Sequence, residues 1–495
     1  MKNLYPTTAN LDKRAISKYN LTSELLMENA ASALAALIER ITHKMSVICI
    51  VCGSGDNGAD GYALARKLHK AYRVQIYVAK EPRSELCKLQ SERAELCGVE
   101  HIKKISPCDV IVDCLFGSGF SGTLNTEFET LILQMNKNGR IRVACDIPSG
   151  LDGSGNIETV AFCAHYTLSM GALKTALYSD SAKDVIGEVV VGDLGISRGL
   201  YEVHTPFFLL EREDLVLPKR TSQNCHKGKF GHLVVVAGEK QGAALLAALS
   251  GLRIGAGLVS IMSAQSVLES STLDSDKIDS STTKTPFVCD IDSVLSYALG
   301  VFPEIMYAHT IPHNANVFVV GMGLGTNKIP LHKIWQSHYM VLDADILYQQ
   351  EVVAALADST LASRVVLTPH PKEFAALFGL CGLGEVSVAE VQAQRFDLAL
   401  RFSEAYPESV LLLKGANTII AHKKQLYVNS LGSSALAKGG SGDVLAGLIG
   451  GYLAQGFSPL EAAKNASLAH ALAAQAEKNN YALTPQRLIE HIGAL

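Results

Sequence analysis

The chain has 495 residues, of which 48% are hydrophobic, and it contains 41 glycines and 15 prolines. This length exceeds one ordinary hydrophobic core, so we expect two or three domains, and the composition is typical of a folded α/β enzyme, which excludes disordered and fibrous proteins. The formal net charge of −4 comes from 44 basic and 48 acidic residues mixed along the chain, so no nucleic-acid or membrane partner is expected.

The apolar segments of the chain favour a cytoplasmic protein. The chain begins Met1–Pro6 without the apolar region of a secretory signal, and its longest apolar run, residues 242–262, is interrupted by Arg253 and several glycines. We therefore expect a cytoplasmic location. In that compartment the eleven cysteines are expected to be free thiols.

The first half of the chain alternates helical and strand patterns. Helical patterns cover residues 23–42, 62–71 and 84–97. Short apolar runs typical of strands cover residues 47–52, 73–79, 110–115 and 141–145. Strands that alternate with helices predict a doubly wound parallel sheet, and apolar strands without a two-residue period fit burial on both faces of that sheet.

Polar and glycine-rich residues follow the strand at residues 47–52. Asp56, Asn57 and Asp60 bring oxygens that could coordinate a cation or hold ribose hydroxyls. The glycine spacing in residues 53–61 is not GxGxxG, so a hydride-transferring dinucleotide domain fits poorly. The simpler interpretation is a polar turn from strand to helix, with Asp60 near the helix cap.

Two further strand ends of the first half carry a carboxylate. Asp113 precedes a second glycine-rich loop at residues 117–119, and Asp146 precedes a turn that Pro148 stiffens. The carboxyl ends of parallel strands meet at one edge of a sheet, where ligands bind. Three carboxylate-bearing strand ends at this edge favour a binding site over three independent helix caps.

A second series of strands and helices follows a change of pattern at residues 204–228. Charged and polar residues replace the periodicity there, and we place the domain boundary between residues 205 and 206. The strand-like runs of the second half cover residues 232–237, 317–321, 340–343, 365–368 and 410–414. We expect a second parallel α/β sheet.

Three strand ends of the second half carry residues suited to a ligand. Gly321, Gly323 and Gly325 would let a ligand approach the backbone. His370 is presented by a turn with two prolines, although a single histidine in such a place is more often structural. Lys414 would reach a phosphate as a point charge.

The segment Lys438–Asp443 opens an apolar helix with a glycine-rich turn. Successive backbone N–H groups without side chains in the way form a cradle for an anion, and the helix N-terminus adds partial positive charge. Beside a bound phosphate, Asp443 would accept the proton of a hydroxyl that attacks the phosphorus. The alternative is an ordinary glycine-rich helix start that Asp443 caps.

Together, the motifs of the second half resemble the ADP/ATP-dependent NAD(P)H-hydrate dehydratases, which have the ribokinase-like fold. The motifs follow in that family's order over nearly all of residues 225–490, and residues 237–244 and 252–259 match its first strand and helix. Met322, Lys372 and Lys438 differ from the residues usual at these places, and none of the three changes removes a presumed chemical group.

The resemblance implies roles for individual residues of the second half. Asp443 would be the catalytic base, and ADP would be the co-substrate, with Mg²⁺ accompanying it. The hydrated cofactor would contact Ala243, Gly323, His370 and Asp443. The nucleotide would contact Lys414, Gly415, Ala416, Asn417, Thr418 and Gly442.

The first half resembles the Rossmann-like NAD(P)H-hydrate epimerase domain, which many bacteria fuse to the dehydratase. Besides the three strand ends, residues 26–30, 170–174 and 187–193 agree, and the match covers roughly residues 10–205. Asp56 replaces a usual Asn and Ala59 a usual Gly. The added carboxylate of Asp56 would disfavour an anionic ligand unless a cation offsets its charge.

This second resemblance also implies site residues. Asp146 would be the acid–base residue, and a potassium ion would be bound by Asn57, Asp113 and Ser149. The substrate would contact Asp56, Asn57, Gly58, Ala59, Asp60, Gly117, Ser118, Gly119, Phe120, Ser121, Gly122, Thr123 and Asp146.

The two resemblances predict two three-layer α/β/α domains in series: a Rossmann-like epimerase domain at residues 1–205 and a ribokinase-like dehydratase domain at residues 206–495. They imply repair of hydrated NADH and NADPH, by interconversion of the R and S hydrates and by dehydration of the S hydrate with ADP, which gives AMP and phosphate. The partners would be small molecules, and a homo-oligomer is expected. The alternative is a small-molecule kinase of ribokinase-like fold with a non-catalytic dinucleotide-binding first half.

Overall fold

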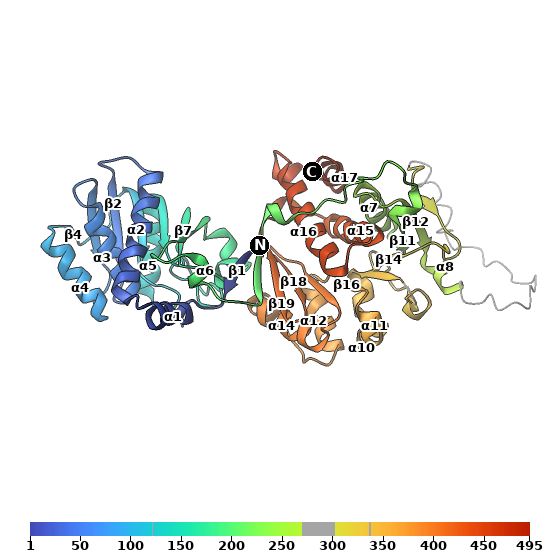
Figure 1. Ribbon diagram of the computed structural model, residues 1–495, viewed down its shortest axis with the longest axis horizontal. Coiled ribbons are helices and arrows are strands. Elements are labelled where there is room, and N and C mark those ends of the chain that lie inside the picture. Colours follow the sequence, from blue (N-terminus) through green and yellow to red (C-terminus); the bar gives the residue numbers. More distant parts are fainter. Residues whose placement is uncertain (121, 270–301, 336–337) are drawn as a thin grey trace, which may run out of the picture. The chain divides into compact units, whose positions relative to one another are not determined.

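The computed structural model describes residues 1–495 except residues 121, 270–301 and 336–337. The chain divides into two compact units, one of residues 2–207 and the other of Met1 with residues 208–495 (Figure 1). The division falls within strand β10 (Phe207–Leu210). Each unit has its own hydrophobic core.

The first unit is built on a sheet of parallel strands. In spatial order they are β4 (Glu100–Ile102), β3 (Arg73–Val78), β2 (Val47–Cys52), β5 (Cys108–Cys114), β6 (Gly139–Cys145), β7 (Tyr166–Met170) and β9 (Glu188–Gly192). Two further strands, β1 (Lys2–Tyr5) and β8 (Leu173–Lys174), pair in parallel with each other. The predicted parallel sheet is confirmed, and β4, β7 and β9 extend it beyond the predicted strands.

Helices cover both faces of this sheet. They are α1 (Ala9–Tyr19), α2 (Ser23–Ile41), α3 (Asp56–Leu68), α4 (Glu85–Leu96), α5 (Thr126–Asn138) and the short α6 (Arg198–Tyr201). Ile50 and Val112 pack in one core cluster with α2, α3 and α4, whereas Val51 and Ile111 pack in another with α5. Successive strand residues therefore face opposite helix layers, which explains why the strands are apolar throughout.

Helix α3 differs from the helix predicted at residues 62–71, because it begins earlier, at Asp56, and ends at Leu68. Glycine and aspartate have low helix propensity, so residues 56–61 do not look helical in the sequence. Tight packing stabilises this start, since a Cβ at Gly58 would overlap the carbonyl oxygen of Gly53. Asp56, Asn57 and Asp60, which were predicted in a turn, therefore lie in the first two turns of the helix.

The second unit is built on a sheet that is parallel from β13 to β17 and ends in an antiparallel hairpin. In spatial order the strands are β13 (Met306–Tyr307), β12 (Leu258–Ser263), β11 (His232–Ala237), β14 (Val317–Val320), β15 (Tyr339–Leu342), β16 (Val365–Leu367), β17 (Val410–Leu413), β18 (Thr418–His422) and β19 (Gln425–Asn429). The hairpin of β18 and β19 was not predicted. Strand β12 was not predicted either, because it lies inside a longer apolar stretch.

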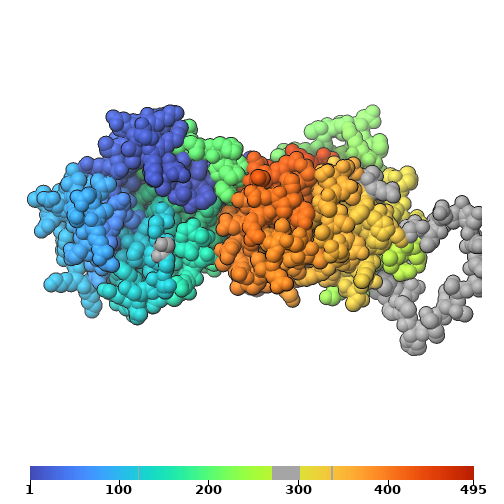
Figure 2. Space-filling view, turned by 90° about the horizontal axis from the view of Figure 1, so that it is seen from below, coloured from blue at the N-terminus to red at the C-terminus, as the bar shows by residue number. Residues whose placement is uncertain are grey.

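Helices also cover both faces of the second sheet. They are α7 (Gln241–Arg253), α8 (Ala264–Glu269), α10 (Gln350–Ala357), α11 (Ser359–Ala362), α12 (Pro371–Leu380), α13 (Val388–Ala393), α14 (Arg395–Ala405), α15 (Ser441–Ala454), α16 (Pro459–Gln475) and α17 (Pro485–Ile492). Helices α7, α15, α16 and α17 lie on one side and α10, α11, α12 and α14 on the other (Figure 1). Figure 2 views the second unit from the side of α10–α14, in yellow and orange. The expected α/β fold class is confirmed.

Two expectations about the whole chain can be compared with the structure. The cysteines in the described residues are free thiols, as expected. None of the helices in the described part of the chain has both the length and the apolar character needed to cross a membrane.

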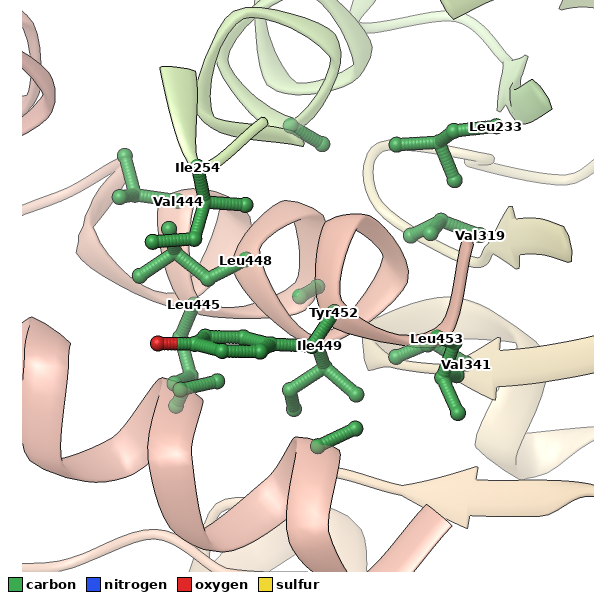
Figure 3. Packing of buried hydrophobic residues seen from close by; sticks show 14 of the residues in the cluster. Leu233, Ile254, Val319, Val341, Val444, Leu445, Leu448, Ile449, Tyr452 and Leu453 are labelled. Carbon is green, nitrogen blue, oxygen red and sulfur yellow. The ribbon is translucent and has the colours of Figure 1, made fainter. Parts of the chain in front are cut away.

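Helix α15 is buried along most of its length in the core of the second unit. Leu448 and Tyr452 lie among side chains of neighbouring helices and strands (Figure 3). Helix α7 approaches so closely that a Cβ at Gly447 would overlap the carbonyl oxygen of Ala247. This packing fixes α15, and with it the first turn that carries Asp443, against the sheet.

Replacing Gly447 by alanine is expected to destabilise the second unit by about 1–3 kcal/mol, because the added methyl group has no space between α7 and α15. Gly242→Ala is the matched control, since Gly242 lies in α7 with nothing within 4 Å of its Cβ position. Chemical denaturation followed by the fluorescence of Trp335, the only tryptophan of the chain, measures unfolding of this unit. Equal stability of the two variants would contradict the close packing.

Candidate functional site

A cavity of about 660 Å³ lies at the carboxyl end of the sheet in the first unit. Strands β2, β5 and β6 end at this edge, and helix α3 begins beside it. The predicted site residues that line the cavity are Asp56, Asn57, Asp60, Gly117, Ser118, Gly119, Phe120 and Asp146. The structure therefore brings together residues that follow each of the three predicted strand ends.

Other predicted residues of this site do not line the cavity. Gly58 and Ala59 are buried within α3, where they pack against the sheet. Gly122 and Thr123 are exposed in the loop that follows β5. Ser121 lies outside the described residues.

Asp146 follows β6 in a backbone conformation that is uncommon for a residue other than glycine, with φ of 72°. Its buried carboxylate accepts hydrogen bonds from Nζ of Lys174 at 2.5 Å and from the N–H groups of Met170 and Ser118 at 3.2 and 3.3 Å. Burial by itself would raise the pKa of Asp146, but the Lys174 charge and these hydrogen bonds hold it below its usual value. Asp146 is therefore ionised, which is the state that accepts a proton.

Lys174 lies in residues 170–174, which agree with the epimerase domain, but no role at this site was assigned to it from the sequence. Its side chain is 2% exposed, and its Nζ also donates to Oγ of Ser169 at 3.3 Å and to the carbonyl oxygen of Met170 at 3.4 Å. A lysine is almost never fully buried unless it is paired. The one available signal was therefore a lysine within the apolar residues 170–177, and this signal does not reveal which carboxylate is the partner.

Asp60 lines the same cavity from helix α3 but has different neighbours. Among the described residues its carboxyl has one hydrogen-bonding neighbour, the thiol of Cys145, with 3.9 Å between Sγ and Oδ2. Burial and the negative charges of Asp146, Asp56 and Asp12 raise the pKa of Asp60 well above its usual value. Asp60 therefore keeps its proton to a higher pH than Asp146 does.

The start of helix α1 supplies two cavity residues that the sequence did not indicate, Thr8 and Asp12. The Tyr201 hydroxyl donates a hydrogen bond to Asp12 at 2.7 Å. Burial raises the pKa of Asp12, although this hydrogen bond and the Lys174 charge oppose the shift. Helix α1 precedes the first predicted helix, and its many polar residues concealed it.

Asn57, Asp113 and Ser149, the predicted potassium ligands, lie close together beside the cavity. Ser149 donates from both its N–H and its Oγ to Asp113 at 2.7 Å. Phe116 links the other two, because its N–H donates to Oγ of Ser149 at 3.0 Å and its carbonyl accepts from the Asn57 amide at 2.9 Å. Carboxylate, amide and hydroxyl oxygens are the donors that hard cations take, so this set fits potassium.

The protonation state of Asp113 affects how well this set of residues would bind a cation. Burial raises the pKa of Asp113 to about 6, in spite of the hydrogen bonds from Ser149, and a positive ion nearby would favour the ionised form. No cluster of three or more His, Cys, Asp or Glu side chains within the described residues is arranged to hold a metal ion.

The second candidate site lies where α15 begins. Gly440, with φ of 91°, is the N-cap residue, and Asp443 lies in the first turn, as predicted. Burial and the negative charge of Asp343 raise the pKa of Asp443 to about 6, while the positive charge of Lys414 opposes the shift. A carboxyl group with this pKa is suited to accept a proton near neutral pH.

Lys414 follows β17 and lies between two carboxylates to which no role was assigned from the sequence. Its Nζ is 2.7 Å from Oδ1 of Asp343 and 3.8 Å from Oε2 of Glu373. Burial would lower the pKa of Lys414, but these two carboxylates raise it above its usual value, so the amine stays charged. Asp343 follows β15 and Glu373 lies in α12, which follows β16. Three neighbouring strand ends thus meet at one lysine.

The predicted nucleotide loop, residues 414–418, is held by the buried Arg395, which the sequence did not indicate. The guanidinium donates to the carbonyl oxygens of Leu413, Lys414 and Asn417 at 3.0, 3.2 and 3.0 Å. A Cβ at Gly415 would overlap this guanidinium. Within the loop, Gly415 and Ala416 are exposed, Asn417 is buried, and Thr418 begins β18.

His370 caps helix α12. Its Nδ1 accepts hydrogen bonds from the N–H groups of Lys372 and Glu373 at 3.1 and 3.3 Å, and the Glu373 carboxylate accepts one from the His370 N–H at 2.8 Å. This capping box gives His370 a structural role. Its side chain is still 46% exposed, so contact with a ligand stays a prediction.

Ala243, Gly323 and Gly442 lie in two helix starts and a loop at the same edge of the sheet. Ala243 is in the first turn of α7, which follows β11, and Gly323 follows β14 with φ of 61°. The Lys240 N–H donates to the Gly323 carbonyl at 3.0 Å and so joins the segments that follow β11 and β14. A Cβ at Gly442 would lie 3.5 Å from Nζ of Lys414. The residues predicted to contact the hydrated cofactor and the nucleotide therefore share one edge.

His470 of α16 is a further buried residue at this edge. Its Nε2 lies 3.2 Å from Oγ and 3.0 Å from the carbonyl oxygen of Ser441, the first residue of α15. Burial lowers the pKa of His470 to about 4, so the imidazole is neutral at pH 7. It helps to fix the start of α15, and nothing in the apolar pattern of α16 indicated it.

Two protein families match the chain. Residues 233–493 match the family described as NAD(P)H-hydrate dehydratase, and residues 23–176 match the family described as YjeF-related protein N-terminus. The first match covers the second unit from β11 to α17 and the second match covers the first unit from α2 to the segment after β8.

Relatives that contain both parts are known. The bifunctional NAD(P)H-hydrate repair enzyme Nnr of Helicobacter pylori is 43% identical over 504 residues, which cover 100% of each chain. The enzyme of the same name from Coxiella burnetii is 32% identical, over 94% of this chain and 92% of its own. A crystal structure of ADP/ATP-dependent NAD(P)H-hydrate dehydratase from Bacillus subtilis, co-crystallised with ATP and Mg²⁺, matches with 25% identity and a TM-score of 0.44, over 58% of this chain and 96% of its own.

Replacing Lys174 by methionine is expected to destabilise the first unit by about 3–5 kcal/mol at pH 7, because the Asp146 carboxylate then stays buried without its partner. The ion pair lowers the folded-state pKa of Asp146, so its contribution is present above the unfolded-state pKa and is lost as the pH falls through the folded-state value. The difference between the variant and the unmodified protein should therefore shrink in acid.

Circular dichroism during denaturation measures this effect. Trp335 lies in the second unit, so the transition that its fluorescence does not report is the unfolding of the first unit. The double variant Lys174→Met/Asp146→Asn is the control, because it removes the unpaired charge and should regain part of the stability. A single variant as stable as the unmodified protein would show that the ion pair does not stabilise the unit.

Proposed function

Because the chain belongs to the family of bifunctional NAD(P)H-hydrate repair enzymes, we propose that each of its units performs one of two activities. The substrates are reduced nicotinamide cofactors that carry water added across the C5–C6 double bond of the dihydronicotinamide ring. The first unit would interconvert the R and S hydrates at C6. The second unit would dehydrate the S hydrate with ADP as co-substrate and so regenerate NADH or NADPH.

In the first unit, Asp146 would handle the proton as the C6 hydroxyl leaves the ring and returns on the other face. It lines the cavity and is fixed by Lys174, which supports this role. The N–H groups of residues 117–119 would hold the pyrophosphate of the cofactor. Asn57, Asp113 and Ser149 would hold potassium, whose positive charge would reduce the repulsion between the acidic cavity and the anionic cofactor.

In the second unit, Asp443 would take the proton of the C6 hydroxyl while the hydroxyl oxygen attacks the terminal phosphorus of ADP. The bond between that phosphorus and the bridging oxygen breaks, and AMP leaves with the bond electrons. Loss of the phosphate from C6 and of a proton from C5 then restores the double bond. The N–H groups of residues 440–442 would stabilise the charge that develops on the phosphoryl oxygens.

The residues around Asp443 would divide between the two substrates. Ala243, Gly323 and His370 would contact the hydrated cofactor, while residues 414–418 and Gly442 would contact the nucleotide, and Mg²⁺ would accompany the nucleotide phosphates. The observation that carries the assignment is the placement of Asp443, with its raised pKa, in the first turn of α15 beside the charged Lys414. A base and a cation that lie side by side at a helix N-terminus are the parts that phosphoryl transfer needs.

Replacing Asp443 by asparagine is expected to lower the turnover number for dehydration by about 10²–10⁴-fold, because the amide cannot take the hydroxyl proton. The pKa of about 6 also predicts that kcat/KM of the unmodified enzyme falls as the pH drops below 6, where Asp443 becomes protonated. Formation of NADPH from the purified S hydrate and ADP, followed by absorbance, measures both effects.

Asp397→Asn is the matched control, because Asp397 is exposed on α14 and should leave turnover unchanged. Near-normal turnover of the Asp443 variant would refute its role as the base. Phosphorus NMR of the products distinguishes the kinase alternative, since a dehydratase releases AMP and inorganic phosphate, whereas a kinase leaves a stable phosphorylated product.

Replacing Asp146 by asparagine is expected to abolish conversion of the R to the S hydrate while dehydration of purified S hydrate continues, because the two reactions use different sites. Chromatographic separation of the epimers over time measures the interconversion, and the absorbance of the NADPH formed from purified S hydrate and ADP measures the dehydration. In the unmodified enzyme, replacement of potassium by choline should slow the conversion. Parallel loss of both activities in the folded variant would contradict the two-site proposal.

A further inference from the structure

Two carboxyl groups of the first-unit cavity have opposite surroundings. The Asp146 carboxylate accepts hydrogen bonds from one ammonium group and two backbone N–H groups, all of which favour its ionised form. The Asp60 carboxyl has the Cys145 thiol as its hydrogen-bonding neighbour in the described part of the chain. When the environments of two titratable groups in one site push their proton affinities apart, one group is set to act as an acid and the other as a base.

We propose that Asp60 is the proton donor and Asp146 the proton acceptor of a single acid–base pair in this cavity. The inference rests on the proposed epimerase function and adds a second proton-handling residue to it. Both side chains line the same 660 Å³ cavity, which Asp60 reaches from helix α3 and Asp146 from the end of β6. Cys145, the neighbour of Asp60, directly precedes Asp146 in the chain, so the two carboxyls belong to one local structure.

The chemistry of epimerisation calls for two such groups. The R and S hydrates carry the C6 hydroxyl on opposite faces of the ring, so interconversion removes the hydroxyl from one face and adds water to the other. Removal needs a proton on the departing oxygen, and addition needs an acceptor for a proton of the incoming water. One protonated carboxyl and one ionised carboxyl supply the donor and the acceptor for one conversion of the R to the S hydrate.

Each step balances in atoms and electrons. The Asp60 carboxyl gives its proton to the C6 hydroxyl, the C6–O bond breaks with its electrons on oxygen, and water leaves. The lone pair of the neighbouring ring nitrogen forms a double bond to C6. Water then attacks C6 from the other face, the nitrogen regains its lone pair, and the Asp146 carboxylate takes the released proton. Exchange with solvent returns the proton to Asp60, and the reverse reaction uses the two groups in the opposite order.

The other charged residues of the cavity also favour a protonated Asp60 and an ionised Asp146. Asp56 and Asp12 both add negative charge near Asp60, which favours its protonated form. Lys174 cancels the charge of Asp146, so the cavity carries less net negative charge than its four aspartates suggest. An anionic cofactor is therefore repelled less than the sequence implies.

Asp60→Asn in the full-length chain tests the proposal. The amide is close in shape to a protonated carboxyl but cannot give up a proton in this role, so conversion of the R to the S hydrate should fall by about 10²–10⁴-fold. Calorimetric titration with NADPH should show binding within a few-fold of the unmodified chain. Asp109→Asn is the matched control, because Asp109 accepts the N–H of Val47 at 2.9 Å, is not among the cavity residues, and should leave conversion unchanged.

The outcomes separate the inference from the function on which it rests. If the unmodified chain interconverts the hydrates and the Asp60→Asn chain does so within threefold of the same rate, the acid–base pair is refuted and the epimerase function stands. If the unmodified chain does not interconvert them, the proposed function of the first unit fails and the pair fails with it. Thermal unfolding followed by circular dichroism shows whether the variant is folded.

The pH profile of the unmodified chain is a second measurement that needs no variant. Activity should fall in acid as Asp146 gains a proton, and it should fall in alkali as Asp60 loses its proton. The groups that face Asp146 are Lys174, the carboxyls of Asp12 and Asp60, the Tyr201 hydroxyl and the Cys145 thiol. The groups that face Asp60 are the carboxyls of Asp146, Asp56 and Asp12 and the thiols of Cys145, Cys114 and Cys87. In the Asp60→Asn variant the alkaline decrease should disappear from the remaining activity. A profile without an alkaline decrease in the unmodified chain would overturn the proposal.

Discussion

A lysine paired with an aspartate lies where parallel strands end in each sheet, and the proton chemistry proposed for both sites depends on these two ion pairs. Lys174 is paired with Asp146 in the first unit and Lys414 with Asp343 in the second. A charge removed from water must be paired. In the first unit, despite burial, the Lys174 charge holds the pKa of Asp146 below its usual value and so favours its ionised state. In the first unit the paired aspartate is the proposed catalytic group. In the second unit, burial and the negative charge of Asp343 raise the pKa of Asp443, while the positive charge of Lys414 opposes the shift.

Close backbone packing places these groups. Helix α3 starts so close to the loop after β2 that Gly58 has no room for a side chain, and Asp60 is carried into the cavity as a result. Helix α15 meets α7 in the same way at Gly447, and its first turn brings Asp443 to the strand ends. Gly58 and Gly447 are thus sites of close helix packing, and this packing places the helix turns that carry Asp60 and Asp443.

The sequence allowed prediction of what is local and periodic, and it concealed what depends on distant contacts. The strand end that carries Asp146 was visible because an apolar run stops there, and the helix start that carries Asp443 was visible because a glycine-rich turn precedes an apolar helix. The start of α3 was not, because glycine and aspartate are poor helix formers that tertiary packing stabilises here. Lys174 and Arg395 were missed because their partners lie far away in the chain. His370 shows the opposite case, since its capping bonds are local and its structural role was foreseeable from the proline at the first position of α12.

The presence of two compact units in one polypeptide has a consequence for stoichiometry. Every molecule synthesised contains one copy of each unit, so the proposed epimerase and dehydratase occur in a fixed one-to-one ratio at any level of expression. A cell cannot adjust the supply of the usable epimer by making more of one protein than of the other. Under the proposed assignment, the balance between the two steps at given substrate concentrations is set by the rate constants and substrate affinities of the two sites.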